Sequence, residues 1–575
     1  MSTNQNDMVI DNGTGLAVRQ DIEDALQALA GNSTGASAPS TNYASQFFAN
    51  TSTSIMQINN TAGNAFINLF TLAGGPAFAV DGTINSVNIG KGANSVASNT
   101  CLGSTALDGS VSGADNTAIG NAVLTVLSSG AANTMVGSNA GLALTTGSSN
   151  TAVGVNALFT GESIANCTAM GRSALKLNTG NSNTAMGYFA LGNNAAGANN
   201  TAMGVNSLLA NLTGVNNVAI GYGSLDANTS ASNNTALGYE AMGANETGTE
   251  CVAVGAYALD HITDANQNTA VGYEAVTTCT SGIRNTGIGR KALNKVVTGQ
   301  QNTAVGSSSL LNNLASNNVA IGNDAMVSNT DGTQNVAVGT FALDANTING
   351  ENTAVGYNAM TTNTEGKENT GIGRQALQFN LTGDYNTSLG VNSCRDNTAA
   401  DSNTGIGHSA LKENETGAQN TALGANAGDI TTTGSNNTSL GYQADPSSNS
   451  ASNEVTLGNS SVTAIRCQVQ TISALSDERD KKDIVDSEDG LDLINALRPR
   501  KFTWAMREPS DNDGKTELGF IAQEIDEVLG NKNDYIGAVY KGNLDKLEAS
   551  YGKFVPILVK AVQELSTKVT ALEAG

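Results

Sequence analysis

The clearest pattern along the chain is a short run of small and large apolar residues that returns every 17 positions. Between Gly103 and Gly458, stretches such as Thr117-Ala118-Ile119 precede a glycine, then Ala-Leu or Ala-Met, and then a loop of Asn, Thr, Ser and Gly. The spacing shortens to 16 only before Gly187 and Gly322. Seventeen residues make one turn of a parallel β-solenoid, so the repeat predicts one unit stacked 22 times.

Both faces of each short strand carry apolar side chains. Successive strand residues point to opposite faces, so Ala118 and Ile119 cannot share one interior. The small alanine suits the inside of a turn, whereas Ile119 and its counterparts would form an exposed apolar stripe on a single chain. We therefore expect other copies to cover this stripe. The recurring glycine permits a positive φ or a close backbone approach, and the preceding Asn predicts a hydrogen-bonded ladder along the axis.

Residues 1–80 lie outside the repeat and show a different pattern. Apolar residues at helical spacing predict a short helix, and they are Val18, Ile22, Ala25, Leu26 and Leu29. A linker rich in Ser, Thr, Gly and Pro follows from Gly31 to Asn42. An aromatic patch then predicts a small β module, formed around Phe47, Phe48, Phe66 and Phe70.

A second change of pattern falls near Thr471, beyond which the sequence becomes densely charged and holds the only tryptophan, Trp504. The pattern predicts a helix over residues 491–497, a strand over 501–506, a polar turn over 510–514 and an amphipathic helix over 520–529. We therefore divide the chain into an N-terminal segment (1–80), a solenoid shaft (81–460), a connector (461–475) and a small α+β domain (476–575).

The last helix is expected to associate with other chains. Its apolar residues alternate at spacings of three and four, which is an a/d seam, and they are Val555, Leu558, Val562, Leu565, Val569 and Leu572. Val at a with Leu at d would by itself favour two strands, so the heptads do not establish a trimer.

Composition and charge narrow the possible functions. The net charge of −23 opposes binding to nucleic acid or to anionic membranes, and no run of 18 apolar residues or secretory signal is seen. Two histidines and six scattered cysteines without a CxxC pair predict no metal centre, no cofactor and no disulfide framework. We interpret the cysteines as reduced, small core residues. No nucleic-acid partner and no membrane insertion are expected.

One position of the repeat admits two interpretations. Tyrosine follows the glycine at Tyr188, Tyr222, Tyr239, Tyr273, Tyr357 and Tyr442, and arginine takes the same place at Arg172, Arg290 and Arg374. Such a row could stack on sugars of a receptor. Alternatively, the position favours β-forming side chains that pack on their neighbours. An enzymatic shaft would need a cleft with paired carboxylates, and no insertion interrupts the repeat to build one.

The shaft resembles a known class of repeats. Asn217-Val218-Ala219-Ile220-Gly221 is the closest copy of the Asn-Ser-Val-Ala-Ile-Gly repeats in the heads of trimeric autotransporter adhesins. Those heads are parallel β-rolls of three chains, so the resemblance implies a homotrimer. The N-terminal stretch resembles attachment segments of phage tail fibres, on Asn6 to Ile10 and Ala38 to Tyr43. That implies anchoring to other virion tail or baseplate proteins.

The last 100 residues resemble the self-cleaving intramolecular chaperone (peptidase S74) of phage tail spikes and fibres, which is also found in myelin regulatory factors. The resemblance is carried by Ser476 to Lys481, Leu497-Arg498-Pro499, Phe502 to Trp504, Gly519 to Glu524 and Tyr551. It implies a single-turnover serine–lysine peptidase with Ser476 as nucleophile and Lys481 as general base. The implied cut lies between Leu475 and Ser476, and Asp477 and Arg479 would orient the segment.

The sequence departs from that family at Asp480, where an apolar residue is usual. A carboxylate there would favour the charged form of Lys481, which cannot accept the serine proton. Lys482 is a second candidate base. Burial at an oligomeric interface would favour the neutral lysine, so that cleavage would follow assembly.

Together these features favour a trimeric phage tail fibre that meets a host surface receptor such as a glycan. It would be assembled in the host cytoplasm and carried on the virion. The alternative is a bacterial trimeric surface adhesin, which would need a secretion signal and a membrane barrel. A self-releasing transcription factor would need a basic DNA-binding face, and this acidic chain lacks one.

Overall fold

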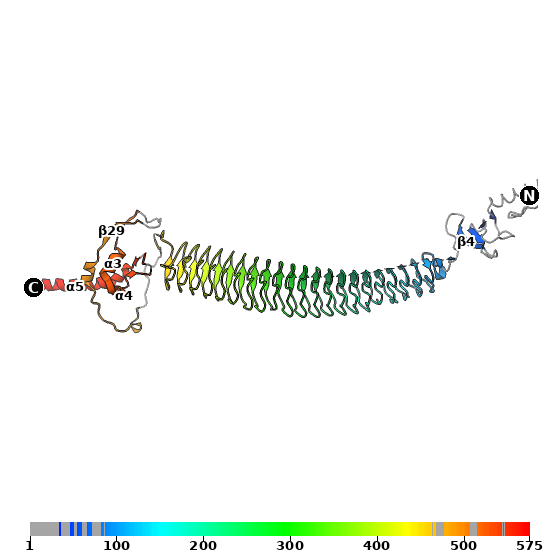
Figure 1. Cartoon of the computed structure of the whole chain (residues 1–575), viewed down its shortest axis with the longest axis horizontal. Helices are drawn as coiled ribbons and strands as arrows, with labels where there is room; N and C mark the ends of the chain where they lie inside the picture. The colour runs from blue at the N-terminus through cyan, green and yellow to red at the C-terminus, as the bar shows by residue number, and fades with distance from the viewer. Residues whose placement is uncertain are drawn as a thin grey trace, which may run out of the picture. The chain divides into compact units, whose positions relative to one another are not determined.

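The structure is a computed structural model that describes residues 87–462, 464–466, 476–505, 514–542, 544–545 and 547–575, together with the backbone of five short strands before residue 87. The predicted helix at residues 18–29, Leu475 and Cys467 lie outside these residues. Two compact units divide the chain, residues 1–267 and 268–575. Both contain the same repeated turn, and together they hold about 21 turns of a parallel β-solenoid (Figure 1).

The first unit begins with a small sheet at the positions of the predicted β module. It pairs β1 (Thr34–Gly35), β2 (Phe47–Asn50), β3 (Ile55–Asn59) and β4 (Phe66–Thr71) in that order. A hairpin follows, formed by β5 (Gly82–Ile84) and β6 (Val87–Gly90). β6 then pairs antiparallel with β7 (Thr100–Gly103), which is the first strand of the solenoid.

From β7 to β16, neighbouring strands of the first unit pair in parallel, each one turn further along the chain. The register is exact at each step, so that Thr151 lies opposite Thr168 and Ala152 lies opposite Ala169. These strands are β8 (Thr117–Ile119), β9 (Thr134–Val136), β10 (Thr151–Val153), β11 (Thr168–Met170), β12 (Thr184–Met186), β13 (Thr201–Met203), β14 (Val218–Ile220), β15 (Thr235–Leu237) and β16 (Val252–Val254).

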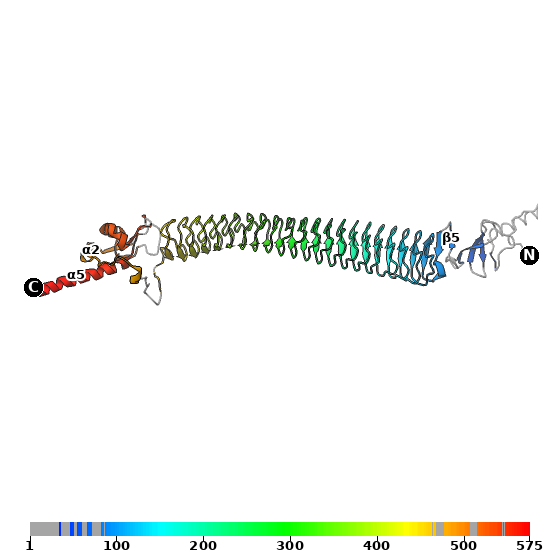
Figure 2. The same cartoon turned by 90° about the horizontal axis from the view of Figure 1, so that it is seen from below.

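The second unit opens with the same ladder. Its strands pair in parallel from β17 to β28, and Figure 2 shows the successive turns from a second direction. They are β17 (Thr269–Val271), β18 (Thr286–Ile288), β19 (Thr303–Val305), β20 (Val319–Ile321), β21 (Val336–Val338), β22 (Thr353–Val355), β23 (Thr370–Ile372), β24 (Thr387–Leu389), β25 (Thr404–Ile406), β26 (Thr421–Leu423), β27 (Thr438–Leu440) and β28 (Val455–Leu457).

The predicted division between an inner and an outer strand face is confirmed. The middle residue of the solenoid strands is buried in both units and usually small, as at Ala118 and Ala304, with Met135 as a larger exception and Thr456 of β28 only partly buried. The third residue points outward and remains partly exposed on the single chain, for example Met170 at 41% and Leu423 at 51%. An apolar stripe therefore runs from turn to turn on the outside of each unit.

The predicted asparagine ladder is also present, and it is fully buried. Asn217 accepts a hydrogen bond from the backbone N–H of Asn234 (3.0 Å) and donates its own amide to the carbonyl of Ala231 (2.8 Å). The same bonds recur turn after turn. Cys167 and Cys251 replace Asn at two steps, where their backbone N–H groups still bond to the Asn of the preceding turn.

A second buried asparagine ladder was not predicted. It runs through Asn194, Asn211 and Asn228, whose side-chain amides bond to one another at 2.5 to 2.7 Å. The two ladders meet most closely where the repeat shortens to 16 residues, because the missing residue falls in the loop between them, and they also meet in a complete turn, where Asn420 donates to Asn414 at 3.4 Å. In the shortened turns Asn183 donates to Asn178 (3.0 Å) and Asn318 donates to Asn313 (3.1 Å).

The turns are closed by backbone in the left-handed region. The recurring glycine takes this conformation as predicted, with Gly204 at φ +139°. A side chain there is also excluded by space, because a Cβ would lie 2.3 Å from the carbonyl oxygen of Gly221 in the next turn. Non-glycine residues, Asn206, Leu208 and Asn216 in that turn, are left-handed as well, and their N–H groups bond to adjacent turns.

The cysteines of the described residues are buried thiols, as predicted. They are Cys101, Cys167, Cys251, Cys279 and Cys394. Burial raises the pKa of the Cys394 thiol to about 12, so that thiol is neutral and unreactive at physiological pH.

The C-terminal domain is a small α+β fold within the second unit. Its elements are η2 (Glu478–Asp480), α2 (Leu491–Ala496), β29 (Arg500–Thr503), β30 (Thr516–Gly519), α3 (Ala522–Leu529), η3 (Gly530–Lys532), α4 (Asn533–Ile536), β31 (Val539–Tyr540), β32 (Glu548–Ala549), η4 (Tyr551–Phe554) and α5 (Val555–Ala574). The three predicted helices are confirmed with ends shifted by at most two residues. The predicted strand over 501–506 is β29, which begins and ends earlier.

The core of this domain lies where α2, α3 and the first turn of α5 meet. It is built from Leu493, Leu497, Ile525, Leu529, Ala538, Val539, Phe554 and Ile557. Ile557 and Ala561 are the buried residues of α5, and both lie in its first half. The helix thus uses one short face to hold the domain, and α2 packs along it (Figure 2).

Candidate functional site

The candidate peptidase segment opens the C-terminal domain with a tight turn. Asp477 caps η2 because its carboxylate accepts the backbone N–H of Arg479 at 2.9 Å. The Arg479 guanidinium returns to the same carboxylate, with Nε at 3.0 Å, and this contact lowers the pKa of Asp477. The two residues thus fix the turn that separates Ser476 from Lys481.

This turn brings the two predicted catalytic residues into contact. The ammonium of Lys481 donates to the hydroxyl Oγ of Ser476 at 2.7 Å and also approaches the Ser476 carbonyl at 3.4 Å. A serine hydroxyl is a weak nucleophile until a base takes its proton, and a neutral Lys481 amine at this distance could do so. The pair therefore has the geometry that a serine–lysine dyad requires.

The neighbouring charged residues do not make the contacts that would compete with this pair. Within residues 476–505, Asp480 forms no ion pair with Lys481 below 4.0 Å, and Lys482 makes no hydrogen bond to Ser476. Lys481 is thus the candidate base by geometry. The effect of Asp480 on cleavage stays a prediction, as does the catalytic assignment itself.

The dyad is open to solvent in the single chain. Ser476, Lys481 and the residues up to Glu488 are exposed, and Asp477 alone among them is half-buried. The other reacting group, the carbonyl of Leu475, lies outside the described residues. The single chain therefore presents the nucleophile and the base without the burial that would favour a neutral lysine.

The other motifs of the resemblance support the domain rather than the dyad. Arg500 and Glu524 form a paired ion contact, with Nε at 2.9 Å from the carboxylate, and this contact lowers the pKa of Glu524. The Tyr551 hydroxyl accepts the N–H of Phe520 at 3.0 Å, and it lies so near Gly519 that a Cβ there would be 2.8 Å away. These residues fix β29, β30 and α3 against the start of α5.

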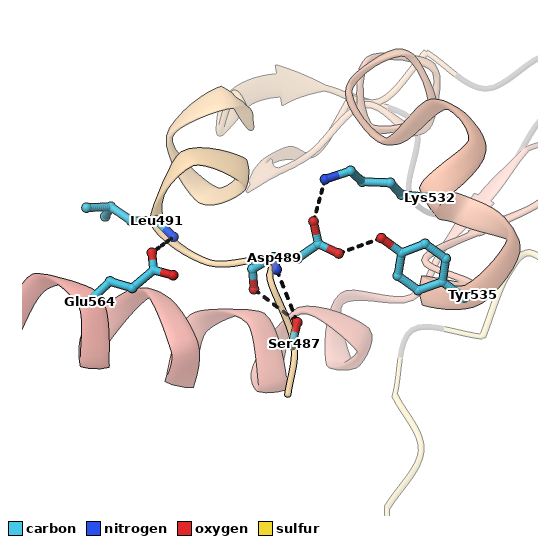
Figure 3. A network of polar contacts seen from close by, with 6 residues as sticks. All are labelled: Ser487, Asp489, Leu491, Lys532, Tyr535 and Glu564. Carbon is cyan, nitrogen blue, oxygen red and sulfur yellow. Dashed lines mark hydrogen bonds and ion pairs between the residues drawn. The ribbon is translucent and has the colours of Figure 1, made fainter. Parts of the chain in front are cut away.

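A polar network that sequence reasoning missed anchors the segment just after the dyad (Figure 3). Asp489 is 7% exposed, and its carboxylate is bonded by the ammonium of Lys532 and by the hydroxyl of Tyr535 at 2.6 Å. These two bonds, led by Lys532, lower the pKa of Asp489. On the next residues, the Glu564 carboxylate of α5 accepts the N–H of Leu491 at 2.8 Å.

The tyrosine row of the shaft packs on itself where tyrosines occupy successive turns. The rings of Tyr222 and Tyr239 stack at 5.2 Å and 10°, and Tyr257 meets Tyr239 edge to face. Elsewhere the Arg172 guanidinium lies 5.9 Å from the Tyr188 ring. These ring contacts agree with the interpretation that the tyrosines pack on their neighbours. Tyr222 and Tyr239 are also partly exposed, so the interpretation as a receptor site stays open.

Metal binding and membrane crossing can be judged for the described residues alone. No group of three or more His, Cys, Asp or Glu side chains there is placed to hold a metal ion. No helix among them has both the length and the apolar character that a membrane crossing needs.

Comparison with known proteins gives one match. Residues 476–533 match the family model Peptidase_S74, described as chaperone of endosialidase. The match covers about a tenth of the chain and includes the dyad, the Asp489 anchor and Lys532. Searches of the curated proteins and of the solved structures found no match. The chain thus joins a segment that is similar to this family to a parallel β-solenoid.

Proposed function

We propose that this chain is a trimeric phage tail fibre whose C-terminal domain assembles it and then cuts itself off. The observation that carries the proposal is the combination of a Peptidase_S74 segment at residues 476–533 with a long solenoid before it. In this proposal the N-terminal segment binds tail or baseplate proteins, and the shaft or its distal end binds a host surface receptor. Assembly takes place in the host cytoplasm, and the product is part of the virion.

Two apolar surfaces support association with other copies. The a/d seam of α5 is exposed along its whole length, from Val555 at 57% to Leu572 at 82%. It is distinct from the face that carries Ile557 and Ala561, so the domain does not use it. The exposed stripe of the solenoid offers a second surface of the same kind. Burial of both in a homotrimer removes apolar area from water at about 25 cal/mol per Å².

The proposed cut is an acyl transfer followed by hydrolysis. The Ser476 Oγ attacks the carbonyl carbon of Leu475 while its proton passes to Lys481 Nζ. The C–N bond to Ser476 breaks, the nitrogen takes a proton from the lysine, and an ester joins Leu475 to Ser476 Oγ. Water then hydrolyses the ester. Closure of the trimer around the exposed dyad would favour the neutral lysine that starts this sequence.

Expression of the full chain tests assembly and cleavage together. We expect an SDS-resistant trimer, thin rods in electron microscopy, and a released fragment of residues 476–575 whose first residue is Ser476. Mass per particle from light scattering establishes the copy number. A monomer, or compact globules in place of rods, would remove the fibre from consideration.

Receptor binding is tested separately with a panel of bacterial surface glycans. The matched variants replace Tyr222 and Tyr239 together by Thr, a β-forming residue without a ring. Loss of binding with an intact trimer assigns the tyrosine row to the receptor. Unchanged binding places the receptor site elsewhere and leaves packing as the role of these rings.

A further inference from the structure

The link between α5 and the start of α2 is unusual in its construction. Helix α2 begins after Gly490, which has no side chain to cap the free N–H groups of the first turn. Glu564 supplies the missing acceptor from 73 residues away, through its bond to the N–H of Leu491. Lys560, one turn earlier on α5, lies 3.7 Å from the same carboxylate.

Glycine at position 490 allows the carboxylate to approach this closely. A Cβ at Gly490 would lie 2.6 Å from both carboxylate oxygens of Glu564, so a side chain there would displace the carboxylate. The carboxylate therefore sits directly against the backbone of the segment that leads to the dyad. The contact thus joins the Glu564 side chain to the backbone at Gly490 and Leu491.

The same segment is fixed on its other side by Asp489. Its carboxylate is held between Lys532 and Tyr535, as Figure 3 shows, and its backbone N–H and carbonyl bond to the hydroxyl of Ser487. By contrast, residues 481–486 are exposed. Residues 476–486, which we call the arm, carry Ser476 and Lys481. The arm is thus anchored at residues 487–491.

Helix α5 carries both Glu564 and the surface that we assign to chain association, on different faces. Glu564 follows Ala561 by three residues and lies on the face that holds the domain, whereas Val562 and Leu565 of the exposed seam, at 64% and 50%, point to another side. Ordering of α5 on association is therefore passed to Leu491 through Glu564, in addition to the packing of α2 along α5. The dyad needs a buried setting that the single chain lacks, and its arm is held to the helix that would bring other copies together.

We propose that Glu564 is a positioning residue for self-cleavage: it ties the arm that carries Ser476 and Lys481 to α5, so that association of α5 places the dyad. This role rests on the proposed autocleavage. Glu564 acts through the backbone of Leu491 and does not touch the reacting atoms.

The test compares three variants of the full chain. Glu564→Ala removes the acceptor, Glu564→Gln retains an oxygen that can accept the Leu491 N–H, and Glu573→Ala removes an exposed carboxylate near the end of the same helix. Each is measured for SDS-resistant assembly, for the rate of fragment release, and for amide hydrogen exchange at residues 488–492.

We expect all three variants to assemble as the parent does. Release should slow by about tenfold in Glu564→Ala, stay within about threefold of the parent in Glu564→Gln, and be unchanged in Glu573→Ala. Exchange at residues 488–492 should quicken in Glu564→Ala alone. Parent-like release in Glu564→Ala would overturn the proposal.

A parent chain that does not cleave itself gives a different result. If it releases no fragment, the peptidase assignment is wrong, and amide exchange then tests whether Glu564 links α5 to Leu491. Faster exchange at residues 488–492 in Glu564→Ala, with protection kept in Glu564→Gln, still assigns the link between α5 and the arm. Equal exchange in all variants removes the link as well.

Discussion

The solenoid and the C-terminal domain are held together in opposite ways. In the solenoid the buried asparagines of the ladder bond to their counterparts one turn away, as Asn217 does with Asn200 and Asn234. In the C-terminal domain the decisive bonds join residues far apart in sequence and unlike one another, such as Asp489 with Lys532 and Leu491 with Glu564. Damage should therefore remain local in the first and spread through the whole domain in the second.

The largest expected effect is on fragment release, and it comes from removing either reacting group of the dyad, the Ser476 hydroxyl or the Lys481 amine. Ser476→Ala and Lys481→Ala should each abolish fragment release while leaving the SDS-resistant oligomer intact, because the turn is fixed by Asp477 and Arg479. Fragment release is followed on denaturing gels and by N-terminal sequencing.

Lys482→Ala is the matched control for the lysine. It should cleave as the parent does, since Lys482 makes no hydrogen bond to Ser476 in the described segment. A cut that persists in Ser476→Ala would remove the catalytic assignment, and loss of release in Lys482→Ala would move the base to that residue.

Replacing a recurring glycine of the solenoid by alanine should give the next largest effect, a loss of local stability. Gly204→Ala meets the carbonyl oxygen of Gly221 at 2.3 Å in a left-handed conformation, and we expect a local loss of about 3 kcal/mol. Amide exchange should quicken in the adjacent turns and stay unchanged several turns away. Gly552→Ala in the C-terminal domain has open space around its Cβ and should change stability by less than about 0.5 kcal/mol.

Substitutions in the asparagine ladder should cause smaller losses of local stability, and the size of the loss should depend on the replacing residue. Asn217→Ala leaves the buried N–H of Asn234 without its acceptor and removes one of the two donors to the carbonyl of Ala231, the other being Asn228, which should cost about 2 kcal/mol locally. Asn217→Cys should cost less, because Cys167 and Cys251 already occupy this position. Amide exchange of Asn234 measures both variants, and an equal loss would show that the ladder does not distinguish cysteine from alanine.

The two regions should respond to acid with opposite signs. Burial, with a smaller contribution from Asp324, raises the pKa of Asp344 in the solenoid to about 6. Its folded form binds a proton more tightly than its unfolded form, so this carboxyl favours folding below the ordinary aspartate pKa of about 3.8, and that support is lost as the pH rises through about 6. The protection factors of amides around Asp344, which are corrected for the intrinsic pH dependence of exchange, should therefore rise on going from pH 7 to pH 5. Asp344→Asn should abolish this change.

The C-terminal domain should lose stability in acid. Lys532, and then Tyr535, lower the pKa of Asp489, so its contribution is fully present above the ordinary aspartate pKa of about 3.9 and disappears as the pH falls through the lowered value. Trp504 fluorescence during denaturant unfolding at pH 5 and pH 3 measures this loss. In Asp489→Asn the loss should be smaller, and an equal loss would assign the acid sensitivity to other carboxylates.

The sequence predicted the solenoid better than the domain for a physical reason. Repetition makes the environment of Ala118 the same as that of Ala304, so one pattern read many times gives the strand, the buried face and the ladder of Asn217. The second ladder was missed because Asn194, Asn211 and Asn228 stand in loops, where asparagine is ordinarily read as a turn former. Left-handed leucines such as Leu208 break a local preference and leave no signal.

The candidate site likewise contains residues that could be predicted from the sequence and residues that could not. Ser476 and Lys481 could be paired from their motif, and their contact is local in sequence. Glu564 could not be found, since nothing in an amphipathic helix distinguishes a carboxylate that caps another helix from one that faces solvent. Only Gly490 before α2 was a signal, because a glycine at that place is compatible with a close approach of another group.

The shortened turns carry an implication for how such a chain can vary in evolution. The loops 178–183 and 313–318 are one residue shorter than their counterparts and still keep both ladders, and the strands on either side pair in the same register as elsewhere. Recombination between misaligned repeats can therefore add or remove whole turns, each product being a foldable shaft. The length of the shaft would then change in steps of one strand spacing, about 4.8 Å, while both ends stay the same.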